Sequence, residues 1–185
     1  MKEDVGNEML VQRAIDGDRA AFAALISRHY DTMFRVAWKY CGNREDAEDI
    51  AQDVCVRLGQ TLQSFTGQSK FSTWLYRVVL NATRDHHRKN VSRAKKLDAW
   101  AAEPYRPDIQ EPEAEQDDET EALWRAVRKL PDRQRDCVLL VFGEELNHAD
   151  AAAALDCAEG TVASNIHDAK KRLKVLLLEE EKVGN

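Results

Sequence analysis

Residues 70–96 have the sequence KFSTWLYRVVLNATRDHHRKNVSRAKK, and this stretch decides how the rest of the chain is interpreted. Its apolar side chains recur at steps of three and four residues, which predicts one face of a helix. These side chains are Phe71, Trp74, Leu75, Val78, Val79 and Ala82. Ser72 lies at the start of the run and is predicted to cap the first turn. We therefore expect a long amphipathic helix here.

The opposite face of this helix is predicted to be basic. The stretch contains eight Lys or Arg residues and one acid, Asp85, in a chain with a net charge of −6. The predicted front consists of Tyr76, Arg77, Leu80, Asn81, Arg84, His87 and Arg88. A face that combines cations, an amide and a ring suits a polyanion with accessible bases. A solvated amphipathic helix without a ligand is the alternative.

The charge is distributed unevenly along the chain. Residues 1–97 have a net charge of +4, residues 98–120 of −8 and residues 121–185 of −2. The acidic segment also contains three of the four prolines, which is typical of a flexible linker. We therefore predict two domains, residues 1–97 and 119–185, joined by an acidic flexible linker at 98–118.

Composition and the chain start restrict the possible compartment. No run approaches the roughly 18 apolar residues that a membrane span requires. The first ten residues, MKEDVGNEML, lack the apolar core of a signal peptide, so we expect a cytoplasmic protein. Four cysteines without a CxxC pair predict reduced, buried thiols. The alternative, a zinc or redox site with the histidines, has no support from spacing.

Helical periodicity extends over both predicted domains, and no strand-like alternation is present. Helices are expected over about residues 8–16, 19–41 and 43–64, with Gly42 closing one helix and Asn43 capping the next. Residues 65–69 are expected to form a loop. Two more helices are expected from about 119 to 130 and from 131 to 142. The predicted fold class is therefore all-α, with two helical domains.

Residues 147–173 have the pattern of a helix-turn-helix: a short Ala-rich helix, a tight turn, and a second helix. The residues expected to face inward on the second helix are Val162, Ile166, Ala169 and Leu173. Its expected outward face consists of Thr161, Ala163, Ser164, Asn165, His167, Asp168 and Lys171. Asn165 and His167 would read base edges, while Lys170, Lys171, Arg172 and Lys174 would hold phosphates. A partner-binding helical hairpin is the alternative.

A polar docking face for a basic partner is predicted on the helix at 43–64. Its residues, Asp49, Gln52 and Asp53, recur at helical spacing. Paired carboxylates also occur in acid–base and metal chemistry. The sequence has no accompanying nucleophile, glycine-rich phosphate loop or pair of histidines at ligand spacing. We therefore expect a binding protein with no enzymatic activity, no cofactor and no metal.

Together these motifs closely resemble the extracytoplasmic-function (ECF, group 4) sigma factors of bacterial RNA polymerase. REDAEDIAQDVCVRL resembles region 2.2, and SFTGQSKFSTWLYRVVLNATRDHHRK resembles regions 2.3 and 2.4. LPDRQRDCVLLVFGEELNHADAAAALDCAEGTVASNIHDAKKRL resembles region 4. The similarity covers nearly the whole chain outside the linker and leaves no room for regions 1.1 or 3.

The resemblance implies a role for individual residues. Asp49, Gln52 and Asp53 would dock on the clamp helices of core RNA polymerase. Single-stranded DNA of the −10 element would be bound by Phe65, Phe71, Ser72, Thr73, Arg77, Asn81, Arg84, Arg88 and Lys89. The −35 duplex would be bound by Thr161, Ser164, Asn165, His167, Lys170, Lys171 and Arg172. A membrane-anchored anti-sigma factor covering both domains is implied as a further partner.

Region 4 departs from the family pattern. Ala163, Asn165 and Asp168 stand where the family has basic residues, and His148-Ala149-Asp150-Ala151 replaces the common Tyr-Glu-Glu-Ile. Fewer phosphate contacts predict a shallow salt dependence for this domain. More promoter discrimination is therefore expected from the −10 pocket around Asn81.

Two other functions remain open at this point. A sigma mimic would bind an anti-sigma factor without initiating transcription and would not co-purify with core polymerase. A dimeric helix-turn-helix regulator would bind intact duplex without polymerase, although no dimerisation segment is evident in the sequence.

Overall fold

The computed structural model describes the backbone of residues 2–98 and 118–183, with side chains for residues 7–93 and 120–179. Every element in these residues is helical, which confirms the predicted all-α class. The N-terminal lobe contains α1 (Lys2–Ile15), α2 (Arg19–Cys41), α3 (Arg44–Thr61), a short 3₁₀ helix (Leu62–Ser64) and α4 (Phe71–Asp98). The C-terminal lobe contains α5 (Asp118–Arg128), α6 (Asp132–Val138), a π-helical turn (Leu139–Gly143), α7 (His148–Leu155) and α8 (Glu159–Val183).

The junction between α2 and α3 forms as the sequence predicts. Gly42 adopts the left-handed conformation, with φ 72°, and ends α2 through a hydrogen bond to the Trp38 carbonyl oxygen. The Asn43 side chain then accepts a hydrogen bond from the backbone N–H of Asp46 at 3.0 Å and caps α3. Helices α2 and α3 can therefore pack as antiparallel neighbours across a very short turn.

Helix α4 starts earlier than predicted. The Lys70 carbonyl oxygen already accepts the Trp74 N–H at 3.1 Å, and the helix begins at Phe71. Ser72 therefore lies inside the first turn, and its prediction as the capping residue is wrong. The apolar back is as predicted, because Phe71, Leu75 and Val79 are buried among the other helices of the lobe.

The helix-turn-helix is present in the C-terminal lobe. Asn147 caps α7 by accepting from the Asp150 N–H at 2.8 Å, and Asp156 ends it in the left-handed conformation. Val162, Ile166 and Ala169 of α8 are buried, as predicted from their spacing. The predicted helix over 131–142 divides into α6 and the π-helical turn that follows it.

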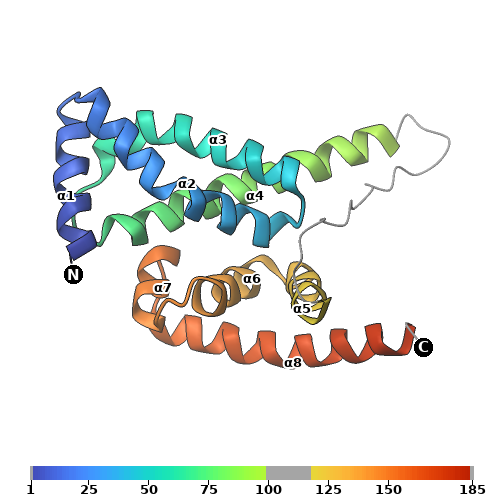
Figure 1. Ribbon diagram of the computed structural model, residues 1–185. Coiled ribbons are helices and arrows are strands. Elements are labelled where there is room, and N and C mark those ends of the chain that lie inside the picture. Colours follow the sequence, from blue (N-terminus) through green and yellow to red (C-terminus); the bar gives the residue numbers. More distant parts are fainter. Residues whose placement is uncertain (1, 99–117, 184–185) are drawn as a thin grey trace.

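The two lobes pack directly against each other. Helix α7 packs against α4, and the π-helical turn and α5 pack against α2, while α8 lies on the outer side of the C-terminal lobe (Figure 1). One cluster of buried apolar side chains includes Leu25, Val36 and Leu75 of the N-terminal lobe together with Leu139 and Leu140 of the C-terminal lobe. The hydrophobic core is therefore continuous across the boundary between the lobes.

The predicted linker, residues 98–118, lies almost entirely outside the described residues; only its ends, Asp98 and Asp118, belong to helices. The domain boundaries at 97 and 119 remain predictions. Within the part of the chain that the structure describes, no helix has the length and apolar character needed to cross a lipid bilayer.

Candidate nucleic-acid interface

The front of α4 faces the C-terminal lobe instead of open solvent. Arg77, Leu80, Asn81 and Arg84 line a small cavity of about 180 Å³ together with Ala154, Leu155 and Asp156. Leu80 has no exposed surface, although the sequence places it on the polar front. Burial by the C-terminal lobe explains this difference, because a residue that faces a second lobe cannot be recognised from the periodicity of its own helix.

Arg77 binds the end of α7. Its Nη2 donates to the Ala153 carbonyl oxygen at 2.6 Å, and its Nε donates to that of Ala154 at 3.2 Å. Asp156 lies 3.8 Å from the same guanidinium group. The last carbonyl groups of a helix have no partners within it and carry partial negative charge. The Arg77 guanidinium group therefore donates to the free carbonyl oxygens of α7, as it would donate to the oxygens of a phosphate.

Arg84 forms an ion pair with Asp136 of α6, donating through both Nε and Nη2 to one carboxylate oxygen. The Asp136 side chain is fully buried and that of Arg84 is 26% exposed. Burial raises the pKa of Asp136, and the opposing charge of Arg84 acts in the other direction. Arg84 also donates to the Asn81 side-chain oxygen at 3.1 Å, so the ion pair orients the amide of Asn81 as well.

Glu144, which follows the π-helical turn, forms a second polar contact between the two lobes. The sequence analysis did not identify this residue. Its fully buried carboxylate accepts hydrogen bonds from Arg35 at 2.6 and 3.1 Å, from Lys39 at 3.0 Å and from the Tyr76 hydroxyl at 3.2 Å. This carboxylate raises the pKa of Arg35, and burial is the main cause of the raised pKa of Tyr76. The only sequence signal was a carboxylate two positions after the apolar run at 137–142, separated from it by Gly143.

The aromatic residues at the start of α4 form a packed cluster. The Phe65 ring lies 5.8 Å from that of Phe71 and 5.5 Å from that of Trp74. Phe71 is 3% exposed and Thr73 is 4% exposed, so their side chains belong to the core. The prediction that these two side chains contact DNA has no support in this conformation, because the core encloses them. Phe65 and Ser72 remain partly accessible.

The following part of α4 keeps its cations exposed, and the end of the helix extends away from the C-terminal lobe (Figure 1). Arg88, Lys89 and Arg93 are all exposed. Asp85, the single acid of the stretch, bonds to Arg57 of α3 at 2.9 Å and to Arg88 at 2.6 Å. Arg57 is the main cause of the lowered pKa of Asp85. This acid therefore joins α3 to α4. The side chains of Lys95 and Lys96 lie outside the described residues.

The outward face of α8 is accessible. Thr161, Ser164, His167 and the cations at 170–172 are exposed, while Asn165 is half-buried and donates to the Thr161 carbonyl oxygen at 2.8 Å. Lys170 lies over the Phe142 ring, 5.3 Å from its centroid. Except for the half-buried Asn165, the predicted −35 residues are therefore exposed on α8.

The predicted polymerase-docking residues are also accessible. Asp49, Gln52 and Asp53 are exposed along one side of α3, followed by Val56, which is 63% exposed. Asp53 pairs with Arg57 at 2.9 Å. Polar groups around an exposed valine suit a partner with a basic rim and an apolar centre.

The comparison of the chain with known proteins agrees with this architecture. Residues 25–94 match the family described as sigma-70 region 2, and residues 120–173 match sigma-70, region 4. The ECF RNA polymerase sigma-E factor of Haemophilus influenzae is 30% identical, over 94% of this chain and 96% of that protein. The RNA polymerase sigma-H factor of Pseudomonas aeruginosa is 31% identical, over 90% of this chain and 91% of that protein.

A solved structure has the same fold. It is the sigma factor RpoE of Bartonella quintana, in complex with the anti-sigma factor NepR. Its TM-score is 0.66 at 24% identity, and the match covers 84% of this chain and 96% of that chain.

Proposed function

The chain belongs to the ECF sigma factors of the sigma-70 family, and we propose that it directs core RNA polymerase to specific promoters and helps to melt them. The observation that carries the proposal is the arrangement of α4, which presents Arg77, Asn81 and Arg84 around one cavity and Arg88 and Lys89 beyond it. A melted strand needs a polar pocket for an unstacked base and cations along its backbone.

In this function the N-terminal lobe binds the −10 element. Asn81 offers an amide to a base edge, and Phe65 provides a partly exposed ring for stacking. Arg77, Arg84, Arg88 and Lys89 hold the phosphates. Phe71 and Thr73 support this surface from within the core instead of contacting the strand.

The C-terminal lobe binds the −35 element through α8. Thr161, Ser164, Asn165 and His167 face the major groove, while Lys170, Lys171 and Arg172 bind the backbone. Asp168 is exposed on the same helix and repels phosphate, which limits the affinity of this contact. The −10 contacts therefore make the larger contribution to promoter discrimination.

The protein has no catalytic role of its own and acts in the cytoplasm as a subunit of the polymerase. Asp49, Gln52 and Asp53 dock on the clamp helices of the largest polymerase subunit. A membrane-anchored anti-sigma factor regulates the protein. The solved sigma factor RpoE, which was crystallised with an anti-sigma factor, supports an anti-sigma factor as a partner, while membrane anchoring is implied by the family resemblance.

Two variants separate polymerase binding from promoter opening. Asp49→Arg reverses a charge on the docking face, so it should reduce co-purification with core polymerase by about tenfold or more. Asn81→Ala should leave co-purification unchanged and reduce run-off transcription from a promoter by about tenfold or more, because one base contact contributes about 1–3 kcal/mol. Arg19→Ala, an exposed arginine at the start of α2, is the control for both assays.

Three outcomes would contradict the proposal. If the wild-type chain does not co-purify with core polymerase, it is a sigma mimic. If it binds intact duplex as a dimer without polymerase, it is a helix-turn-helix regulator. If Asn81→Ala transcribes like the wild type, the −10 site lies elsewhere.

A further inference from the structure

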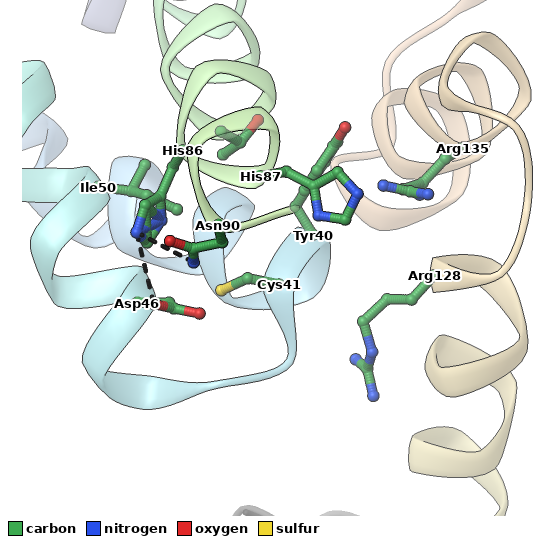
Figure 2. Close-up of a pocket in the computed structure, with 10 residues that line it drawn as sticks. Tyr40, Cys41, Asp46, Ile50, His86, His87, Asn90, Arg128 and Arg135 are labelled. Atoms are coloured by element: carbon green, nitrogen blue, oxygen red, sulfur yellow. Dashed lines mark hydrogen bonds and ion pairs between the residues drawn. The ribbon is translucent and has the colours of Figure 1, made fainter. Parts of the chain in front are cut away.

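We propose that a small cavity at the boundary between the lobes binds one phosphate group, either free inorganic phosphate or the phosphate of a phosphomonoester. The cavity has a volume of about 140 Å³ and lies between α2, α3 and α4 on one side and α5 and α6 on the other (Figure 2). None of the described residues that line it is among the proposed contacts with polymerase or promoter DNA. A phosphate site here is therefore a function additional to promoter recognition.

Three buried donor groups of the cavity lining have no acceptor. Tyr40 Oη, Arg128 Nη1 and Arg135 Nε have no hydrogen-bond partner among the described residues. Tyr40 is 3% exposed and Arg135 is 7% exposed, so both side chains are largely shielded from bulk solvent. An arginine nitrogen can only donate, and burial of such a donor without an acceptor costs free energy. The cavity therefore suits a ligand that offers several acceptors.

Two contacts fix the position of Arg128. Its Nη2 donates to the carboxylate of Glu121 on the same helix. Its guanidinium group lies against Gly42, where a Cβ would be only 2.6 Å from Arg128 Cζ. Any side chain at position 42 would therefore displace the guanidinium group. The ion pair with Glu121 uses one terminal nitrogen, so the other, Nη1, is left for a ligand.

Arg135 and Tyr40 are fixed against each other. Arg135 Nη2 donates to the Leu130 carbonyl oxygen at 2.9 Å, and its guanidinium carbon lies 4.7 Å from the centre of the Tyr40 ring. Burial raises the pKa of Tyr40 to about 12, so its hydroxyl keeps the proton at neutral pH and can donate. Donors that are already held in place bind a ligand with little further loss of side-chain entropy.

The charges around the cavity favour an anion. Among the described residues that line it, the two arginines are the cations and Asp46 is the acid, which leaves one positive charge when the imidazoles are neutral. The Asp46 carboxylate lies 3.5 Å from His86 Nε2, so part of its charge is directed at that ring. Glu121 and Asp132 contact the Nη2 atoms of the arginines but do not line the cavity. The donors without partners are therefore on other nitrogens.

The size and the access of the cavity suit a single phosphate group. One water needs about 10–15 Å³, so a cavity of about 140 Å³ has room for a small polyatomic anion but not for a nucleic acid strand. Figure 2 shows both arginines extending from the C-terminal lobe toward α2 and α4. His87 of α4 is exposed, so one side of the cavity reaches solvent and leaves space for an ester group. Phosphate oxygens are strong acceptors for guanidinium groups.

The test is isothermal titration calorimetry of the full chain with sodium phosphate at pH 7 and constant ionic strength, with sodium chloride as the reference titration. Phosphate stabilises folded proteins in general because it is excluded from their surfaces, so a heat of binding is more informative than a change in melting temperature. A titration with adenosine 5′-monophosphate distinguishes the two sources of the phosphate group. Tighter binding of the nucleotide would assign the site to a phosphomonoester, and tighter binding of phosphate would assign it to the free anion.

Two variants remove the donors singly. Arg128→Gln removes a charged donor and should weaken phosphate binding by about tenfold or more. Tyr40→Phe removes only the hydroxyl and should weaken binding by about threefold to tenfold, without loss of stability, because an unpaired buried hydroxyl disappears. The matched controls are Arg125→Gln, at an exposed arginine of α5, and Tyr30→Phe, at a half-buried tyrosine of α2. Both controls should bind phosphate like the wild type.

A wild type that gives no saturable heat with either ligand would overturn the proposal, because the cavity would then hold water only. Tyr40→Phe with the same phosphate affinity as Tyr30→Phe would also overturn it. If Arg128→Gln does not fold, as judged by circular dichroism, the comparison of the two tyrosine variants decides. These measurements involve neither polymerase nor DNA, so their failure is distinct from a failure of the proposed function.

Discussion

The ion pair between Asp85 of the basic stretch and Arg57 of α3 shows how a single charge can stabilise the fold. Arg57 bridges Asp53 of its own helix and Asp85 of α4, with both contacts at 2.9 Å. The sequence identifies Asp85 as the only acid among eight cations, but it gives no partner for it. The partner lies 28 positions away, on a helix whose position relative to α4 is set by tertiary packing.

We predict a pH-dependent contribution of Asp85 to stability. Arg57 lowers the pKa of Asp85 in the folded protein, so the stabilisation is present above the unfolded pKa near 4 and is lost as the pH falls through the lower folded value. Asp85→Asn should reduce the free energy of unfolding at pH 7 by less than about 1 kcal/mol, because the carboxylate is more than a third exposed and screened by solvent.

Urea unfolding of the wild type and Asp85→Asn at pH 7 and at pH 3 checks this prediction. The difference between the two proteins should shrink at pH 3. A difference of the same size at both pH values would show that the ion pair is not its cause.

At the scale of the helices, local signals gave most of the structure correctly. The bounds of α2, the caps at Gly42 and Asn43 and the inward face of α8 agree with the predictions. These features depend on residues within one turn or one helix, so the sequence contains the information. The start of α4 was misjudged because Ser72 is a good capping residue, yet tertiary packing of Phe71 extends the helix beyond it.

We predict that the Asn43 cap stabilises the N-terminal lobe. Asn43→Ala removes the acceptor for the Asp46 N–H and should reduce the free energy of unfolding by about 1 kcal/mol. Asn43→Ser is the matched control, because serine keeps a side-chain acceptor at this position and should stay close to the wild type. Urea denaturation midpoints at constant slope measure both changes. Equal losses in the two variants would mean that the side-chain hydrogen bond is not the source of the stability.

At the scale of the whole molecule, the sequence predicted two lobes but not their contact. Arg35 and Glu144 are 109 positions apart, and Arg84 and Asp136 are 52 apart. Such pairs leave no periodic signal, and an arginine that binds a carboxylate looks the same in sequence as one that binds DNA. The basic residues of the candidate site could therefore be predicted from the sequence. That the C-terminal lobe covers several of them could be seen only in the structure.

The coverage of α4 also changes the expected behaviour of the complete protein. Among the described residues, exposed surfaces include the docking side of α3, the cations Arg88, Lys89 and Arg93 of α4, and the outward face of α8. If the proposed roles are correct, the polymerase-docking and −35 residues are accessible in this conformation, whereas the pocket around Asn81 is bounded by α7.

The most direct test of the central claim is to sequence the 5′ ends of transcripts made from the organism's own genomic DNA by core polymerase with and without the purified chain. We predict a set of start sites that depends on the chain, is lost with Asn81→Ala, and shares one conserved −10 element with a less conserved −35 element. The same start sites with core polymerase alone, or start sites without a shared −10 element, would contradict the assignment as a promoter-specificity subunit.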